Sequence, residues 1–123
     1  MWDAEAGNPA RRNITRMMEI NQALSRYAAM HDDTYPESIE VLFQDGYLKA
    51  PVSAKSVLTG KPYVYVAAGE KVPEKLKDRW PFVVMYDENP DPSGWHPCVF
   101  ASWVGGVIRT EDLKEQLEKR RTL

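Results

Sequence analysis

Apolar residues recur every three or four positions between Pro9 and about Met30, which predicts one long amphipathic helix. Asn8 and Pro9 suit its start, because Asn caps free backbone N–H groups and Pro fits the first helical turn. Asn21 and Ser25 interrupt the apolar half of the circumference, so this face is less apolar than that of a typical core helix. The apolar half carries Ile14, Met17, Met18, Ile20, Leu24, Tyr27 and Ala28.

Pro36 predicts a break in the chain followed by a second, short helix, because proline keeps the preceding residue out of helical geometry. We expect this helix over Glu37–Phe43. Asp45 and Gly46 then end it, since glycine is the residue best able to adopt a left-handed cap.

The second half of the chain changes to the β-branched and aromatic runs typical of strands. Tyr63–Val66 and Phe82–Tyr86 are predicted as strands separated by a charged connection over 70–79, and a proline-rich loop is expected over Asp87–Pro97. Two further apolar runs, Cys98–Val104 and Val107–Arg109, predict a hairpin that turns at the two glycines between them.

The C-terminal segment predicts a charged helix over Glu111–Arg121, capped by Thr110, with Leu113 and Leu117 to bury. Strands with short connections pair antiparallel, because a parallel crossover needs a dozen or more residues. The predicted fold class is therefore α+β, a small antiparallel sheet with the long N-terminal helix across one face. A polar leader over 1–8 precedes a single domain over 9–123.

The long helix is predicted to extend beyond the edge of the sheet. A helix of about 22 residues spans roughly 33 Å, whereas a strand of five or six residues reaches only ~17–20 Å. We therefore expect the apolar side to be only partly buried towards its N-terminal end and to seek a partner helix. The candidate contact residues are Ile14, Met17, Ile20 and Leu24.

Composition excludes several classes of function. The 123 residues suit one ordinary soluble domain, and 16 basic against 18 acidic residues lack the basic excess of a nucleic-acid binder. One cysteine and two histidines are a poor set of zinc ligands, and Cys98, in a predicted strand, is expected to be a small buried hydrophobe. The sequence contains no apolar run long enough to span a membrane.

The densest group of carboxylates lies in the loop after the second predicted strand. Asp87, Asn89 and Asp91 resemble the alternating oxygen ligands that open a calcium loop. Pro92 and Cys98 stand where that loop needs glycine and a bidentate glutamate. A proline-rich surface turn with local hydrogen bonds is the favoured interpretation, so we expect no bound metal, with calcium as a weak candidate.

The two histidines are weak candidates for catalysis. His31, beside Asp32 and Asp33, has the neighbours of a general base, but no nucleophile stands near it in the sequence and a histidine at a helix end is the favoured interpretation. His96 is expected to be a loop residue. The sequence contains no nucleophile elbow, phosphate loop or dinucleotide fingerprint, so the chain is predicted not to be an enzyme.

The sheet half of the chain is rich in aromatic residues, which either fill the core or mark a contact surface. The members are Trp80, Phe82, Tyr86, Trp95 and Trp103. Among them the loop-borne Trp95 is the candidate exposed anchor, because tryptophan is favoured at the centre of interfaces.

Three short motifs suggest a family. The helix end and the Tyr35-Pro36 step, from Leu24 to Leu42, are followed by the segment Thr59–Tyr65, which contains Gly-x-Pro-Tyr-x-Tyr. This order resembles the soluble part of bacterial pseudopilins, the type IV pilin-like proteins. The apolar pair 99–101 and 107–109 is similar to their late strand pair. Its connection departs from the family's usual Asp-Gly-His turn, and the charged C-terminal helix is an addition.

The resemblance implies a non-enzymatic structural subunit of a pilus-like assembly or a type II secretion pseudopilus, acting by polymerisation and protein contact. Its partners would be other pilin-like subunits or secretion-system proteins, with no nucleic acid and no organic cofactor, although major pseudopilins bind calcium. Such subunits lie on the periplasmic face of the bacterial inner membrane, anchored by an N-terminal hydrophobic segment, which we expect to have been trimmed from this chain. The alternative is a free-standing soluble protein-binding module.

Overall fold

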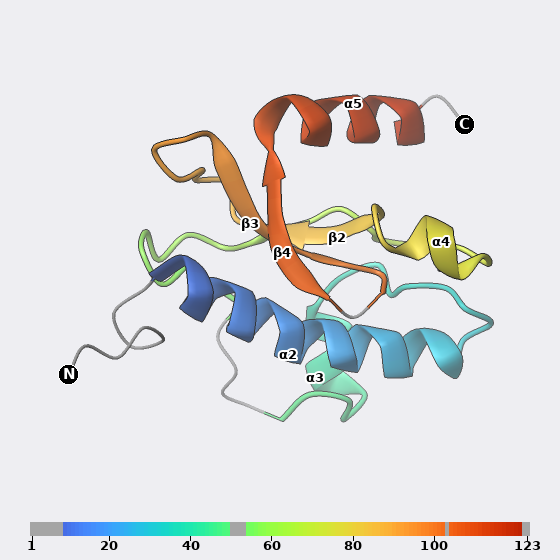
Figure 1. The fold of residues 1–123 in the computed structure, drawn as a ribbon. Coiled ribbons are helices and arrows are strands. Elements are labelled where there is room, and N and C mark those ends of the chain that lie inside the picture. Colours follow the sequence, from blue (N-terminus) through green and yellow to red (C-terminus); the bar gives the residue numbers. More distant parts are fainter. Residues whose placement is uncertain (1–8, 50–53, 103, 122–123) are drawn as a thin grey trace.

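The computed structural model describes residues 9–49, 54–102 and 104–121, which Figure 1 traces from blue to red. The predicted α+β class is confirmed, and the leader over 1–8, the Asn8 cap and Trp103 lie outside the described residues. None of the helices in the described ranges is both long and apolar enough to cross a membrane. In chain order the elements are α2 (Pro9–Ala29), α3 (Glu40–Gln44), β1 (Val64–Tyr65), α4 (Leu76–Arg79), β2 (Val83–Tyr86), β3 (Trp95–Phe100), β4 (Gly105–Arg109) and α5 (Thr110–Arg121).

The sheet has the strand order β1-β2-β3-β4, so each strand pairs with its neighbour along the chain. All three pairings are antiparallel. The short connections predict this for β2–β3 and β3–β4, whereas the β1–β2 connection contains α4 and is long enough for either direction. Figure 1 shows α2 below the sheet and α5 above it, so a helix covers each face. Two hydrophobic clusters result, a larger one towards α2 and a smaller one towards α5.

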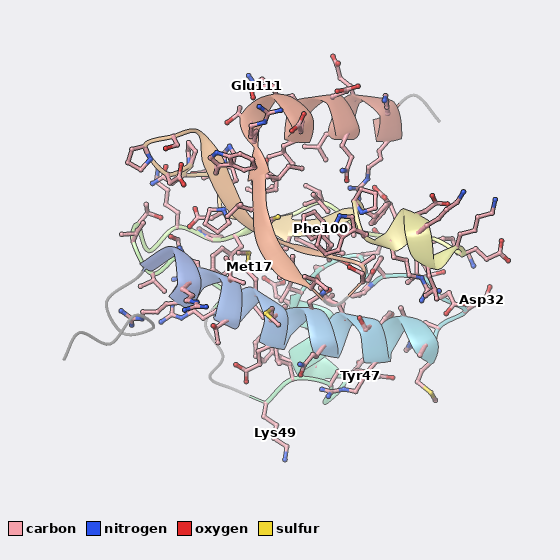
Figure 2. All side chains as sticks on the ribbon, viewed as in Figure 1. Met17, Asp32, Tyr47, Lys49, Phe100 and Glu111 are labelled. Carbon is pink, nitrogen blue, oxygen red and sulfur yellow. The ribbon has the colours of Figure 1, made fainter. Side chains whose placement is uncertain are left out.

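The apolar side of α2 is covered along nearly its whole length. Met17, Ile20 and Leu24 are fully buried, so the expectation of partial burial is wrong for these three, and Ile14 is half-buried. Figure 2 shows Met17 in the layer between α2 and the sheet. The strands alone would not cover the helix, but core residues from the connecting segments extend the cover: Tyr35, Leu42, Leu48 and Tyr63.

The second helix begins later than predicted. Expected over Glu37–Phe43, it forms as α3 only from Glu40. A helix starting at the predicted place would use the Pro36 carbonyl for the N–H four residues on, but that carbonyl accepts the Tyr65 hydroxyl at 2.7 Å. Gly46 ends the helix with φ of +78°, in the left-handed conformation that the sequence predicts.

The proline-rich loop is shorter than predicted, because β3 already begins at Trp95. His96 and Pro97 are therefore strand residues. The N–H and C=O of a strand residue point to the same side, and the Pro97 carbonyl accepts the Asp87 N–H at 2.9 Å. Pro97 has no N–H to donate on that side. The residue opposite is Asp87, just beyond the end of β2, so no hydrogen bond of the β2–β3 pairing is lost.

The predicted hairpin turn at Gly105 and Gly106 is wrong, since both glycines lie within β4. The chain reverses ahead of them, between the end of β3 and Val104. A Cβ added at Gly105 would collide with Ile14 Cγ2 and lie 3.0 Å from Met18 Sδ. Glycine stands there because α2 crosses close over β4.

The charged C-terminal helix is confirmed as α5, and it docks on the domain through both apolar and charged groups. Leu113 is buried against the sheet. The Arg120 guanidinium donates to the Val83 carbonyl at 2.7 Å and forms an ion pair with Glu70 at 2.9 Å. The polar contacts of Arg120 therefore supplement the small apolar strip of this helix.

Candidate interaction surfaces

Asp87, the first candidate calcium ligand, lies inside the protein, with a side chain only 2% exposed. Its Oδ2 accepts hydrogen bonds from Asn13 Nδ2 at 2.9 Å and from Ser56 Oγ at 2.6 Å. Asn13 Oδ1 in turn accepts the Tyr63 hydroxyl at 2.6 Å. Burial raises the pKa of Tyr63 to about 12, so this hydroxyl stays protonated. This buried polar network joins the start of α2 to the end of β2.

The other two candidate ligands belong to a surface turn. Asn89 is exposed, and its backbone N–H donates to Asp87 Oδ1 at 3.0 Å. Asp91 Oδ1 accepts the backbone N–H groups of Ser93 at 2.9 Å and Trp95 at 3.0 Å. These are the local hydrogen bonds of the favoured interpretation. In the described part of the chain, no three His, Cys, Asp or Glu side chains are placed together to hold a metal ion.

His96 is buried between the loop after β2 and the start of α5, which corrects its prediction as a loop residue. Its Nδ1 lies 2.8 Å from the Asp87 carbonyl and its Nε2 lies 3.0 Å from Thr110 Oγ1. A carbonyl can only accept, so Nδ1 donates its proton to Asp87. The Thr110 hydroxyl lies within hydrogen-bond distance of both Nε2 and the Gly94 carbonyl, the latter at 3.3 Å. Both ring nitrogens are therefore occupied by structural hydrogen bonds.

His31 and Cys98 have the ordinary structural roles that the sequence favours. The His31 ring stacks on Tyr27 with centroids 3.7 Å apart, and its Nδ1 lies 2.8 Å from the Tyr27 carbonyl. Cys98 is fully buried. Burial raises the pKa of its thiol to about 12, so the reactive thiolate is suppressed.

Trp95 keeps part of the exposure expected of a contact residue. Its side chain is 36% exposed, and the Arg109 guanidinium lies 5.6 Å from its ring centroid, a cation–π arrangement across β3 and β4. Val107 on β4 is also exposed. Of the five candidate contact residues, therefore, only Trp95 and the half-buried Ile14 present surface in this conformation.

A further apolar surface lies at the end of the predicted charged connection over 70–79 and at Trp80, one of the aromatic residues expected to fill the core or mark a contact surface. Leu76 is 76% exposed and Trp80 is 56% exposed, although the Trp80 ring stacks on Phe100 with centroids 5.4 Å apart. Figure 2 shows Phe100 beside α4, on the α5 side of the sheet. We call this surface the α4 tip and define it as Lys75, Leu76, Lys77, Arg79 and Trp80. Three consecutive charged residues separate Leu76 from Trp80, and α4 is a single turn, too short for a helical period to be recognised in the sequence.

A second surface is an open groove of about 330 Å³ between α3 and β1. Ile39, Phe43 and Tyr65 form its apolar floor, and the exposed Glu37 and Glu40 stand at its rim. We call it the α3 groove. The Tyr65 hydroxyl donates to the Pro36 carbonyl at 2.7 Å. Burial raises the pKa of this hydroxyl.

A comparison with protein-family models finds no match, and neither do comparisons with curated proteins and with solved structures. The functional conclusion therefore depends on the residues and their geometry.

Proposed function

We propose that this chain is a non-enzymatic structural subunit of a pilus-like assembly or a type II secretion pseudopilus. The observation that supports this most is the architecture: a long N-terminal helix laid along a meandering four-stranded antiparallel sheet. The Tyr35-Pro36 step and the Gly-x-Pro-Tyr-x-Tyr sequence fall at the helix end and at the first strand, in the order found in pseudopilins.

The tyrosines of both motifs form hydrogen bonds between separate parts of the fold, which explains their spacing. Tyr35 is buried, and its N–H donates to the Glu70 carbonyl at 2.9 Å, which fixes the end of α2 to the segment after β1. Tyr63 bonds Asn13 on α2, and Tyr65 bonds the Pro36 carbonyl. The motifs thus fasten the first strand to both ends of the long helix, as a rigid building block requires.

The chemistry of the described residues favours contact over catalysis. The buried polar side chains of Asp87 and His96 are engaged by partners from the chain itself. Several large apolar side chains remain outside, among them Leu76, Met30, Leu58 and Trp80, and exposed apolar side chains suit burial against another protein. Polymerisation and protein contact, without a cofactor, are therefore the proposed mode of action.

The test begins with the native reading frame ahead of Met1. A basic leader followed by a hydrophobic segment continuous with α2 is expected, which would anchor the subunit on the periplasmic face of the inner membrane. The full native chain should then fractionate with membranes and give ladders of cross-linked oligomers in cells. A native chain without that segment, found in the soluble fraction, would contradict the proposal and favour a free-standing protein-binding module.

A further inference from the structure

The α4 tip has the composition of an interface anchor. Leucine and tryptophan stand exposed on one short helix, and the fold gains little from keeping them there. Trp80 is already held by stacking on Phe100, so it would lose little rotamer freedom on binding. Around these two residues the chain is basic, with Lys75, Lys77 and Arg79 against Asp78, while Lys71 is already paired with Asp32 at 2.9 Å. A partner for this surface should therefore be apolar at its centre and acidic at its rim.

The α3 groove has that chemistry. Its floor is apolar, and both charged residues in its lining, Glu37 and Glu40, are acidic. The Glu37 carboxylate lies beside Gly69, where an added Cβ would be 2.7 Å from Oε1. The volume of about 330 Å³ is enough for one large side chain and part of another.

We propose that the α4 tip of one copy docks into the α3 groove of a second copy, with Leu76 and Trp80 on the apolar floor and the lysines opposite Glu37 and Glu40. This inference rests on the proposed function, since it names the contact by which subunits polymerise. The apolar anchors supply the affinity, and the charge pairs at the rim set orientation and partner choice.

The two surfaces share no residue, and Figure 1 shows α4 and α3 on different sides of the molecule. One copy can therefore engage two neighbours at once. A contact between two different surfaces is heterologous, and it propagates into a ring or an open filament rather than stopping at a dimer. This is the symmetry that a filament subunit needs.

The test is sedimentation velocity on the 123-residue chain from micromolar to millimolar concentration. Wild type is expected to form species that grow beyond the dimer as concentration rises. A tip variant, Leu76→Ser with Lys77→Glu, and a groove variant, Glu40→Lys with Ala68→Arg, should each be monomeric. All four positions are exposed, so folding should be retained, and thermal melts check this. The matched control is Leu58→Ser with Lys114→Glu, also exposed and outside both surfaces, and it should associate as wild type does.

Mixing the two monomeric variants gives the decisive result. One intact tip meets one intact groove, so the mixture should form a 1:1 dimer and no larger species. A wild type that stays monomeric, or stops at a dimer abolished equally by both variants and not restored by mixing, would overturn the inference. Binding to anionic lipid vesicles that needs Leu76, without self-association, would also overturn it and assign the tip to a membrane surface. None of these results alters the membrane fractionation of the native chain, which tests the proposed function separately.

Discussion

The two ends of the molecule differ from the usual arrangement of polar and apolar groups: one end buries polar side chains, and the other exposes apolar side chains. Near the start of α2, the Asp87 carboxylate is buried together with its two polar partners, the Asn13 amide and the Ser56 hydroxyl. At the far end, beside the end of α2 in Figure 1, α4 holds Leu76 and Trp80 out in solvent. Buried polar groups are costly unless they bond each other, so the first end is a structural device. Exposed apolar groups contribute little to folding, and the second end carries the contact surface that we propose.

Sequence reasoning placed the candidate chemistry at the first end, because carboxylates in a loop resemble ligands. The structure turns Asp87 inwards and leaves only local turn bonds for Asp91. At the second end the sequence indicated a charged connection over 70–79, followed by Trp80 as one of several aromatic candidates for the core or a contact surface. The difference shows that the type of a polar residue is a weaker guide to function than the burial of its side chain.

Breaking the buried polar network should have the largest effect. Asp87→Ala leaves Asn13 Nδ2 and Ser56 Oγ without their acceptor inside the protein, and the free energy of unfolding should fall by about 2–4 kcal/mol. Denaturant titration measures this. Asp91→Ala, at an exposed position with turn hydrogen bonds, is the control and should cost less than about 1 kcal/mol. Equal losses in the two variants would show that the Asp87 network is not structural.

The close crossing of α2 over β4 should give the next largest effect. Gly105→Ala places a methyl group against Ile14 and Met18, and the required shift should cost about 1–3 kcal/mol. Gly106→Ala is the matched control on the neighbouring residue, where an added Cβ lies 3.4 Å from Phe100, close to ordinary contact. A turn role for the two glycines would instead make both substitutions similarly costly.

Changes at the α4 tip should hardly alter folding. Leu76→Ser removes an apolar side chain that is 76% exposed, so the free energy of unfolding of the monomer should change by less than about 0.5 kcal/mol. Thermal melts at low concentration measure this, and the same variant should weaken association at high concentration. A large loss of stability would mean that Leu76 supports the fold and would remove the basis for an interface there.

The smallest effect is expected from calcium. Asp87 already accepts bonds from Asn13 and Ser56, and Asp91 from two backbone N–H groups, so neither carboxylate is poised for a cation. Tm should be the same with millimolar calcium and with a chelator. A saturable rise in Tm that is lost in Asp91→Ala would contradict this and bring the chain closer to calcium-binding major pseudopilins.

The sequence predicted the elements whose signals are local and long. The 3.6-residue period of α2, the β-branched strands and the left-handed Gly46 are set by neighbouring residues, and each is confirmed. The misses depend on distant contacts. The Pro36 carbonyl ahead of α3 accepts the Tyr65 hydroxyl, and Gly105 and Gly106 pair with Val99 and Cys98 in the sheet, where α2 leaves no room for a Cβ at Gly105.

The same limit applied to the candidate sites. Asn21 seemed to weaken the apolar face of α2, yet it is buried and its amide donates to the Phe100 carbonyl at 2.9 Å, which ties helix to sheet. Leu76 gave no signal and Trp80 was only one of five aromatic candidates, because the exposure of an apolar residue depends on what the rest of the chain leaves uncovered. The α4 tip and the α3 groove can be recognised as surfaces only in the folded structure.

Site-directed disulfide cross-linking tests the central contact most directly. Leu76→Cys on the α4 tip and Ser38→Cys in the lining of the α3 groove are made in separate chains, which are mixed and oxidised under mild conditions. The buried Cys98 thiol, whose pKa is raised to about 12, should not take part. The account predicts a disulfide between residue 76 of one chain and residue 38 of the other, well above either homodimer. Cross-links between two copies of residue 76, or none above an exposed Leu58→Cys control, would contradict it.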